Sequence, residues 1–170
     1  MYYWIVVILS GTEDWKIKIR EYWDMFREEA EWNFPNDAAQ AFLSSIWKAS
    51  IKDLDGMEVQ VVVDSNDNIF ISSGTPSFVS FMQHEDELTK QTMKIPIKAW
   101  IHTHPFGSAY FSSVDWSTIN TWETIMDNAI VLGRMEYYSY HIPSDKGRKV
   151  FFGDDGEIKD IVYYMGDEEE

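Results

Sequence analysis

The spacing of apolar and polar residues predicts helices in the first third of the chain. Apolar side chains recur at helical spacing between positions 13 and 32, which predicts an amphipathic helix over much of that range. The beginning of this range, WKIKI, also alternates with the period of a strand, so a strand is the alternative there. A second helix is expected from a cap at Asn36 or Asp37 to about Ser50, with its inward face formed by Ala38, Phe42, Ile46 and Trp47. Before both helices, the run YYWIVVIL is too short to span a bilayer and is expected to be a buried strand, not a signal peptide.

Alternating patterns and turn residues predict a sheet in the rest of the chain. Residues 57–64 and 68–72 are expected to form a hairpin around the turn SND. A helix is expected at 113–127, and further strands are expected at 95–104, 128–133, 137–142 and 149–152. The pattern leaves two segments open: 77–93 as a helix or a flap, and 157–165 as a helix or a strand. This order of elements predicts an α/β or α+β fold in which helices sandwich a mixed β-sheet.

Composition narrows the class of protein. The 170 residues are expected to form a single domain, 1–170, and a hydrophobic content of 45% supports a packed core. The formal net charge of −15 argues against direct binding of nucleic acid, because phosphate contacts require lysine and arginine. The acidic end, residues 166–170, is expected to be a solvated tail. With no membrane partner predicted, we expect a cytoplasmic protein, whose oligomeric state the sequence leaves open.

The stretch WIHTHPFGSAYFSSVD carries the candidate chemistry. Residues two apart in a strand share a face, so His102 and His104 can bind one cation. Ser112 or Ser113 is a natural helix N-cap, which places Asp115 in the first turn. If that turn folds back over the end of the strand, Asp115 becomes a third ligand. Two histidines, a carboxylate and an open fourth position are typical of catalytic zinc, with iron or manganese as alternatives. The absence of cysteine excludes thiolate ligands and disulfides.

The spacing H-x-H-x7-S-x2-D resembles the signature of the JAMM (MPN+) metalloproteases, and the wording WIHTHP…SSVD is similar to that of AMSH-type deubiquitinases. The resemblance covers about residues 57–143 and assigns no role to the strand and helices of 1–55. It implies a JAMM/MPN-like fold with a cytidine-deaminase-like architecture. It also implies one Zn²⁺ ion per chain, with His102, His104 and Asp115 as metal ligands.

The same resemblance implies a mechanism and a substrate. Members of the family use an upstream glutamate as general base, for which Glu58 is the best candidate and Glu85 and Glu87 are alternatives. Ser112 would donate a hydrogen bond to the developing oxyanion. The expected activity is that of a zinc-dependent metallo-isopeptidase or peptidase, and the expected partner is a protein substrate such as a ubiquitin-like conjugate. Segment 74–93 would form one wall of its groove.

One departure keeps other functions open. AMSH-type proteins follow the glutamate with a strand that contains glycine, whereas EVQVVVD has none and is more similar to the RadC branch of the same fold. The alternatives are therefore a RadC-like protein with a DNA-repair-associated or other hydrolytic role, or a non-catalytic JAMM-fold scaffold. The two remaining histidines are expected to be an exposed His84 and a structural His141.

Overall fold

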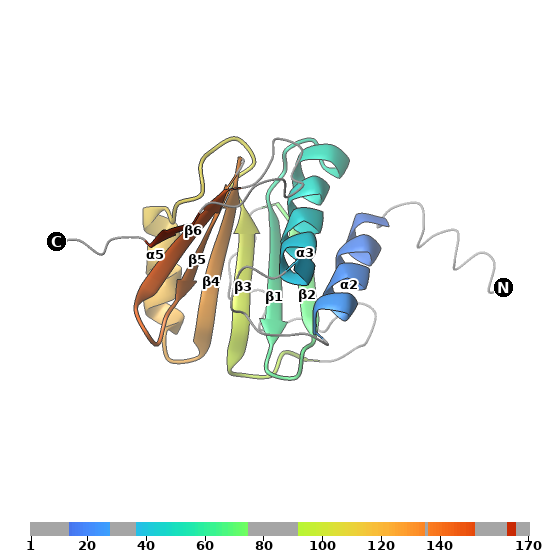
Figure 1. Ribbon diagram of the computed structural model, residues 1–170. Coiled ribbons are helices and arrows are strands. Elements are labelled where there is room, and N and C mark those ends of the chain that lie inside the picture. Colours follow the sequence, from blue (N-terminus) through green and yellow to red (C-terminus); the bar gives the residue numbers. More distant parts are fainter. Residues whose placement is uncertain (1–13, 28–36, 75–91, 135, 152–162, 166–170) are drawn as a thin grey trace.

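A mixed sheet of seven strands forms the centre of the protein (Figure 1). The computed structural model describes residues 14–27, 37–74, 92–134, 136–151 and 163–165. The strands are β1 (Val59–Asp64), β2 (Ile69–Ser73), β3 (Ile97–Thr103), β4 (Met126–Gly133), β5 (Glu136–His141), β6 (Lys146–Phe151) and β7 (Tyr163–Met165). Their order across the sheet is β2-β1-β3-β4-β5-β6-β7. Only the β3–β4 pair is parallel among these strands, and the other neighbours are antiparallel.

Helices cover both faces of the sheet. The first face is covered by α2 (Asp14–Arg27) and α3 (Asp37–Lys48), and α3 continues into a π-helical turn, η1 (Ala49–Asp53). The other face carries α5 (Ser113–Trp122), which is the crossover between the parallel strands β3 and β4. The predicted sandwich around a mixed sheet is therefore confirmed in its coarse form, as a mixed α+β fold. Among the described helices, none is both long and apolar enough to cross a bilayer.

The core explains why the N-terminal segments are helical. In α2 the buried side chains are Trp15, Ile19, Trp23 and Phe26, which are three or four residues apart and share one helical face. The alternative of a strand at WKIKI is thus wrong, because the helical period places these large side chains against one another. Trp23 and Phe42 pack with their ring centroids 5.2 Å apart, which joins α2 to α3. The predicted inward residues Phe42, Ile46 and Trp47 are buried, whereas the side chain of Ala38 lies outside the described residues.

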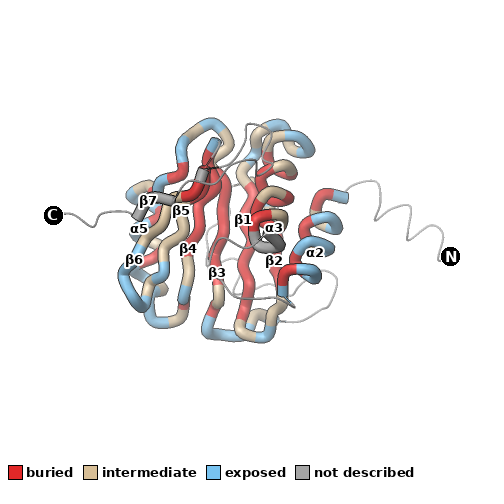
Figure 2. The backbone as a smooth tube through the Cα atoms, viewed as in Figure 1, coloured by how far each residue is buried: buried red, intermediate tan, exposed pale blue. Residues whose placement is uncertain are grey.

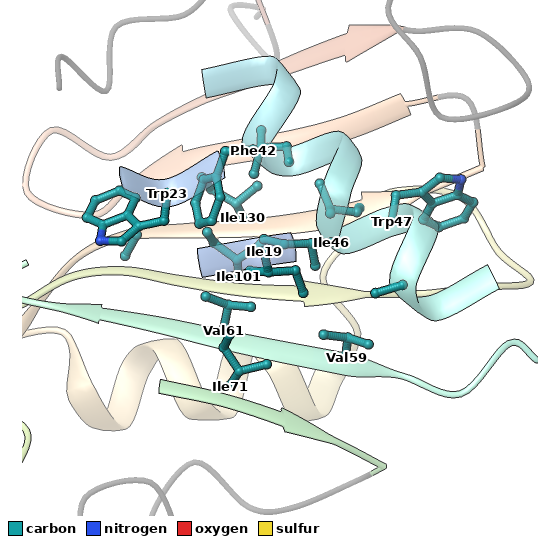
Figure 3. Packing of buried hydrophobic residues seen from close by; sticks show 14 of the residues in the cluster. Ile19, Trp23, Phe42, Ile46, Trp47, Val59, Val61, Ile71, Ile101 and Ile130 are labelled. Atoms are coloured by element: carbon teal, nitrogen blue, oxygen red, sulfur yellow. The ribbon is translucent and has the colours of Figure 1, made fainter. Parts of the chain in front are cut away.

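The strands next to the candidate site are buried on both faces. Figure 2 shows that buried backbone is concentrated in β1, β3 and β4. On one face, Val61, Ile101 and Ile130 face the side chains of α2 and α3 (Figure 3). On the opposite face a second cluster, which includes Trp100 and Ile119, packs beneath α5. From Ala99 to Ile101, successive residues of β3 therefore alternate between two cores, and His102 points to the α5 face together with Trp100.

Several predicted boundaries differ from the structure. The helix expected at 113–127 ends at Trp122, because Ile125 N–H bonds back to Trp122 O at 2.9 Å and Met126 then pairs with Ile97 in the sheet. The end of the ambiguous segment 157–165 is the strand β7. The N-terminal apolar run, most of 77–93 and the tail 166–170 lie outside the described residues.

Candidate metal centre

The connection from β3 to α5 brings together the three predicted ligands. His102 is near the end of β3 and His104 follows that strand by one residue. Asp115 occupies the third position of α5, which begins close to the carboxyl end of β3 because it is the crossover from that strand. His102 and Asp115 are buried, and His104 is partly buried. Each of the three side chains contributes one ligand atom, and these atoms lie within 4.8 Å of one another.

The distances fit a tetrahedral metal ion. Asp115 Oδ2 is 3.2 Å from His102 Nε2 and 3.3 Å from His104 Nε2. Metal–ligand bonds of about 2.0–2.1 Å at the tetrahedral angle would separate ligand atoms by about 3.3–3.4 Å. Within the described part of the chain, neither ring nitrogen of the buried His102 has an aligned hydrogen-bond partner. A buried nitrogen lone pair without a partner is costly, and a cation between the three side chains would satisfy it. The group can therefore hold a metal ion.

The charges of the site are coupled. Burial favours the neutral form of Asp115, but the two imidazoles and the Ser112 N–H outweigh it and hold the pKa of this carboxyl well below its usual range. The Asp115 carboxylate raises the pKa of His104 against the opposing effect of burial, and the negative charge of Glu58 adds to this. Without metal, the ionised Asp115 thus favours the protonated form of His104.

Aromatic stacking holds the His102 ring. The Trp100 indole lies almost parallel to it, at 16°, with a centroid distance of 4.5 Å. Trp100 Nε1 donates to Gln60 Oε1 at 3.3 Å, and Gln60 is the register partner of His102 on β1. The orientation of this imidazole is therefore set by packing against a ring that is itself anchored to the neighbouring strand.

Ser112 begins α5 through a capping box. Its Oγ accepts from Asp115 N–H at 3.1 Å, while Asp115 Oδ2 accepts from Ser112 N–H at 2.8 Å. The expectation that Ser112 or Ser113 caps this helix is confirmed for Ser112. The same carboxylate oxygen that faces both imidazoles is thus fixed by the helix cap. Since the Ser112 oxygen accepts in this box, its hydroxyl proton is available for donation.

The charge of Glu58 is near enough to His104 to raise the pKa of that imidazole, but Glu58 does not lie within a strand. It directly precedes β1 and is thus one residue outside the observed strand, whereas the sequence predicted it within a strand over 57–64. Its backbone carbonyl accepts from Gly74 N–H at 2.8 Å, and the next N–H, that of Val59, donates to Thr103 Oγ1 at 2.9 Å. Because Thr103 lies between the two histidines, this bond ties the segment of Glu58 to the end of β3. The alternatives Glu85 and Glu87 lie outside the described residues.

Exposed apolar side chains occur on the loop between β3 and α5 and in the first turn of α5, which carry two of the ligands. Phe106 is 86% exposed, and the other large exposed side chains of this region are Tyr110, Val114 and Trp116. Phe106 reaches back to the turn before Glu58, where a Cβ at Gly56 would lie 2.3 Å from its ring. Of the two remaining histidines, His141 is exposed at the end of β5, and its Nδ1 lies 2.7 Å from Ser144 Oγ. It pairs with Asn128 and not with Val131, the register partner of His102, so it is not part of the ligand group. His84 lies outside the described residues.

Sequence reasoning missed the residues that support the ligands. Trp100 stacks on His102, and Thr103 accepts from Val59 N–H. Gly133 and Glu136 both contact the loop between β3 and α5. Trp100 and Thr103 were within the motif, where their alternation with the histidines was the available signal. Gly133 and Glu136 follow the motif by many residues, and nothing in the linear pattern connects them to it.

Comparison of the chain with protein-family models, with curated proteins and with solved structures finds no match in any of the three. The assignment of a function to this centre therefore depends on its own geometry and on the sequence motif.

Proposed function

We propose that this protein is a zinc-dependent hydrolase of peptide or isopeptide bonds, with the JAMM/MPN-like fold that its motif implies. The observation that supports it best is the meeting of His102 Nε2, His104 Nε2 and Asp115 Oδ2 at distances that suit a tetrahedral metal. The charge of Glu58 is also near enough to raise the pKa of His104. When bound, zinc would supply Lewis acidity and lower the pKa of a coordinated water.

Side chains of the protein would carry out proton transfer, stabilise the oxyanion and orient a metal ligand. Glu58 is suited to take a proton from the attacking water and to pass it to the leaving amine, because its charge lies close enough to His104 to raise the pKa of that imidazole. Ser112 is suited to donate its hydroxyl proton to the oxygen that becomes negative, since its own oxygen accepts within the capping box. Trp100 keeps the His102 ring in one orientation.

The surroundings favour a polypeptide substrate. The exposed side chains of Phe106, Tyr110 and Val114 provide apolar contacts next to the ligands. A ubiquitin-like conjugate, whose extended tail is joined to a lysine, is the substrate that the family resemblance favours. The net charge of −15 opposes a substrate rich in phosphate.

The first experiment measures zinc per chain by elemental analysis in the wild type and in a His104→Ala, Asp115→Ala double variant. We expect about one zinc per chain in the wild type and its loss in the double variant. An absence of metal in the wild type, even after incubation with zinc, would overturn the proposal.

The second experiment compares Glu58→Gln with Glu21→Gln, an exposed glutamate on α2 that serves as the matched charge control. The substrates are an isopeptide-linked ubiquitin dimer and a library of linear peptides. We expect Glu58→Gln to keep its zinc and to lose about 10²–10⁴-fold in turnover, as for removal of a general base, while Glu21→Gln retains activity. Bound zinc without cleavage of either substrate class would favour the scaffold alternative.

A further inference from the structure

A buried carboxylate on β5 holds the loop that carries His104. Glu136 is only 7% exposed, and its Oε1 accepts from Ala109 N–H at 2.9 Å. Lys149 on β6 lies 3.3 Å from the same oxygen and balances its charge. The bond to Ala109 anchors the loop between β3 and α5, residues 104–112, which we call the metal loop. The buried carboxylate of Glu136 therefore joins the metal loop to Lys149 of its own sheet.

The peptide that Glu136 holds lies directly on Gly133. A Cβ at Gly133 would be 2.3 Å from Ala109 N and 2.4 Å from Ser108 C, distances that no side chain tolerates. The need for glycine here comes from the close approach of the metal loop, so the Ser108–Ala109 peptide is fixed from below by Gly133 and at its N–H by Glu136.

The residue that follows this peptide packs against the metal ligand. The Tyr110 ring lies edge-on to the His104 imidazole, with ring centroids 5.3 Å apart. Gly107 N–H donates to His104 O at 3.1 Å, so the metal loop turns back on His104 before it reaches Ala109. The Ser108–Ala109 peptide therefore connects the buried carboxylate to the side chain that packs on the imidazole.

We infer that Glu136 is a positioning residue for His104, which acts through the Ser108–Ala109 peptide and thereby sets the metal affinity of the centre. Ligand histidines commonly bond to a carboxylate or a backbone carbonyl that orients the ring. Here the carboxylate holds the Ala109 N–H, and the ring of the next residue, Tyr110, packs on the imidazole. The inference rests on the metal site of the proposed function, but not on its hydrolytic activity.

Neighbouring bonds make the effect separable from unfolding. His104 N–H donates to Leu132 O at 2.7 Å, and Arg134 N–H donates to Gly107 O at 2.9 Å. Both anchor the first half of the metal loop to β4 and the turn after it without any contribution from Glu136. The side chain of Lys149 is 32% exposed and can turn to water when its partner is removed. Loss of Glu136 should therefore loosen the peptide at Ala109 while the sheet remains.

The test measures zinc affinity by competition with a chromogenic chelator, and the visible spectrum of the Co²⁺-loaded protein as a readout of ligand geometry. Glu136→Leu removes the acceptor, whereas Glu136→Gln keeps an oxygen in place. We expect Glu136→Leu to bind zinc about 10- to 100-fold more weakly, as for loss of an outer-shell partner, with an altered Co²⁺ spectrum. Glu136→Gln should restore affinity and spectrum to nearly those of the wild type.

Asp64→Leu is the control for loss of a buried carboxylate as such. Asp64 is fully buried and accepts from the N–H groups of Asn66, Asn68 and Lys94 at the opposite end of the sheet from His102. Its replacement should lower stability without changing zinc affinity.

Gly133→Ala keeps the carboxylate and displaces the peptide, so it tests the inference if Glu136→Leu does not fold. Its control is Gly107→Ala in the same loop, where a Cβ would meet nothing closer than His104 Cβ at 3.9 Å. We expect weaker zinc binding in Gly133→Ala and not in Gly107→Ala. If a folded Glu136→Leu or Gly133→Ala variant shows wild-type zinc affinity and a wild-type Co²⁺ spectrum, the inference about Glu136 is wrong, while the metal site stands. If the wild type fails to bind zinc, both the inference and the proposed metal site are wrong.

Discussion

Asp115 connects helix formation to the candidate chemistry. Its Oδ2 accepts the Ser112 N–H at 2.8 Å and faces both imidazoles at 3.2 and 3.3 Å. The helix cap thereby fixes the oxygen that the metal would share with the histidines. In the absence of metal, the same oxygen stabilises a protonated His104.

The stability of the metal-free protein should depend on pH through this pair. The folded pKa of His104 is raised above 6.5, so its contribution is complete below 6.5 and is lost as the pH rises through the raised value. The pKa of Asp115 is lowered from 3.8, so its contribution is present above 3.8 and is lost as the pH falls below it. We expect Asp115→Asn to reduce the free energy of unfolding more at about pH 6 than at about pH 9, as measured by urea denaturation with chelator present. An equal reduction at both pH values would contradict the pairing.

Among individual residues, the sequence predicts the metal ligands but not the residues that hold the ligand-bearing loop in place. His102, His104 and Asp115 lie within one short stretch, where the periods of strand and helix are enough to bring them together. Glu136 meets the metal loop only because β4 and β5 pair beneath it, with Gly133 opposite Glu136 in the register. Such a contact depends on tertiary packing, so it cannot be predicted from the local periodicity of the sequence.

The start of α5 depends on Ser112, for which we propose two roles that a pair of variants can separate. Ser112→Ala removes both the cap and the hydroxyl, and should destabilise the protein by about 1 kcal/mol. Ser112→Asn keeps a capping oxygen, so its stability should stay close to that of the wild type. If the hydroxyl donates to the oxyanion, both variants should lose about 10²–10³-fold in turnover.

Thermal denaturation and steady-state kinetics would measure the two effects of Ser112, with the exposed neighbour variant Ser113→Ala as the control. Normal turnover in Ser112→Asn would show that the residue acts as a helix cap alone.

The end of β3 and the start of β1 are joined by a buried chain of hydroxyls. Thr103 Oγ1 accepts from Val59 N–H and donates to Ser50 Oγ at 3.2 Å, and Ser50 Oγ donates to Met57 O at 2.6 Å. Thr103→Val keeps the shape of the side chain but leaves the buried Val59 N–H without its acceptor. We expect a loss of about 1–3 kcal/mol in the free energy of unfolding by urea denaturation. Thr121→Val, on the exposed side of α5, should change it by less than about 0.5 kcal/mol; a similarly small change in Thr103→Val would contradict this role.

At the scale of elements, long periodic segments were predictable and their ends were not. The helical period of α2 outweighed the short alternation in WKIKI, because four large side chains bury on one face. The π-helical turn η1 was not predicted, since Leu54 N–H bonds to Ala49 O five residues back, outside the ordinary helical period. The overlong helix at 113–127 failed because pairing of Met126 with Ile97, a contact distant in sequence, begins β4.

The charge of the whole molecule affects any measurement of metal binding. With 29 acidic and 14 basic residues, the chain repels itself and attracts divalent cations non-specifically. Any cation should therefore stabilise the fold slightly by screening. A specific site must be distinguished from this background by its selectivity and by its dependence on the three ligands.

Zinc should stabilise the wild type by mass action, because it binds the folded chain in preference to the unfolded one. At a free concentration of about 100 times the dissociation constant, the gain is about 2.7 kcal/mol. For a chain of this length that corresponds to a rise of about 5–11 °C in the unfolding midpoint. Differential scanning calorimetry with zinc, and with magnesium at equal ionic strength, would measure it. Magnesium should give only the screening effect, since it prefers oxygen ligands, and His102→Ala should reduce the response to zinc to that level. Equal stabilisation by both ions, or an undiminished zinc response in His102→Ala, would show that the acidic surface and not the His102–His104–Asp115 group binds the metal.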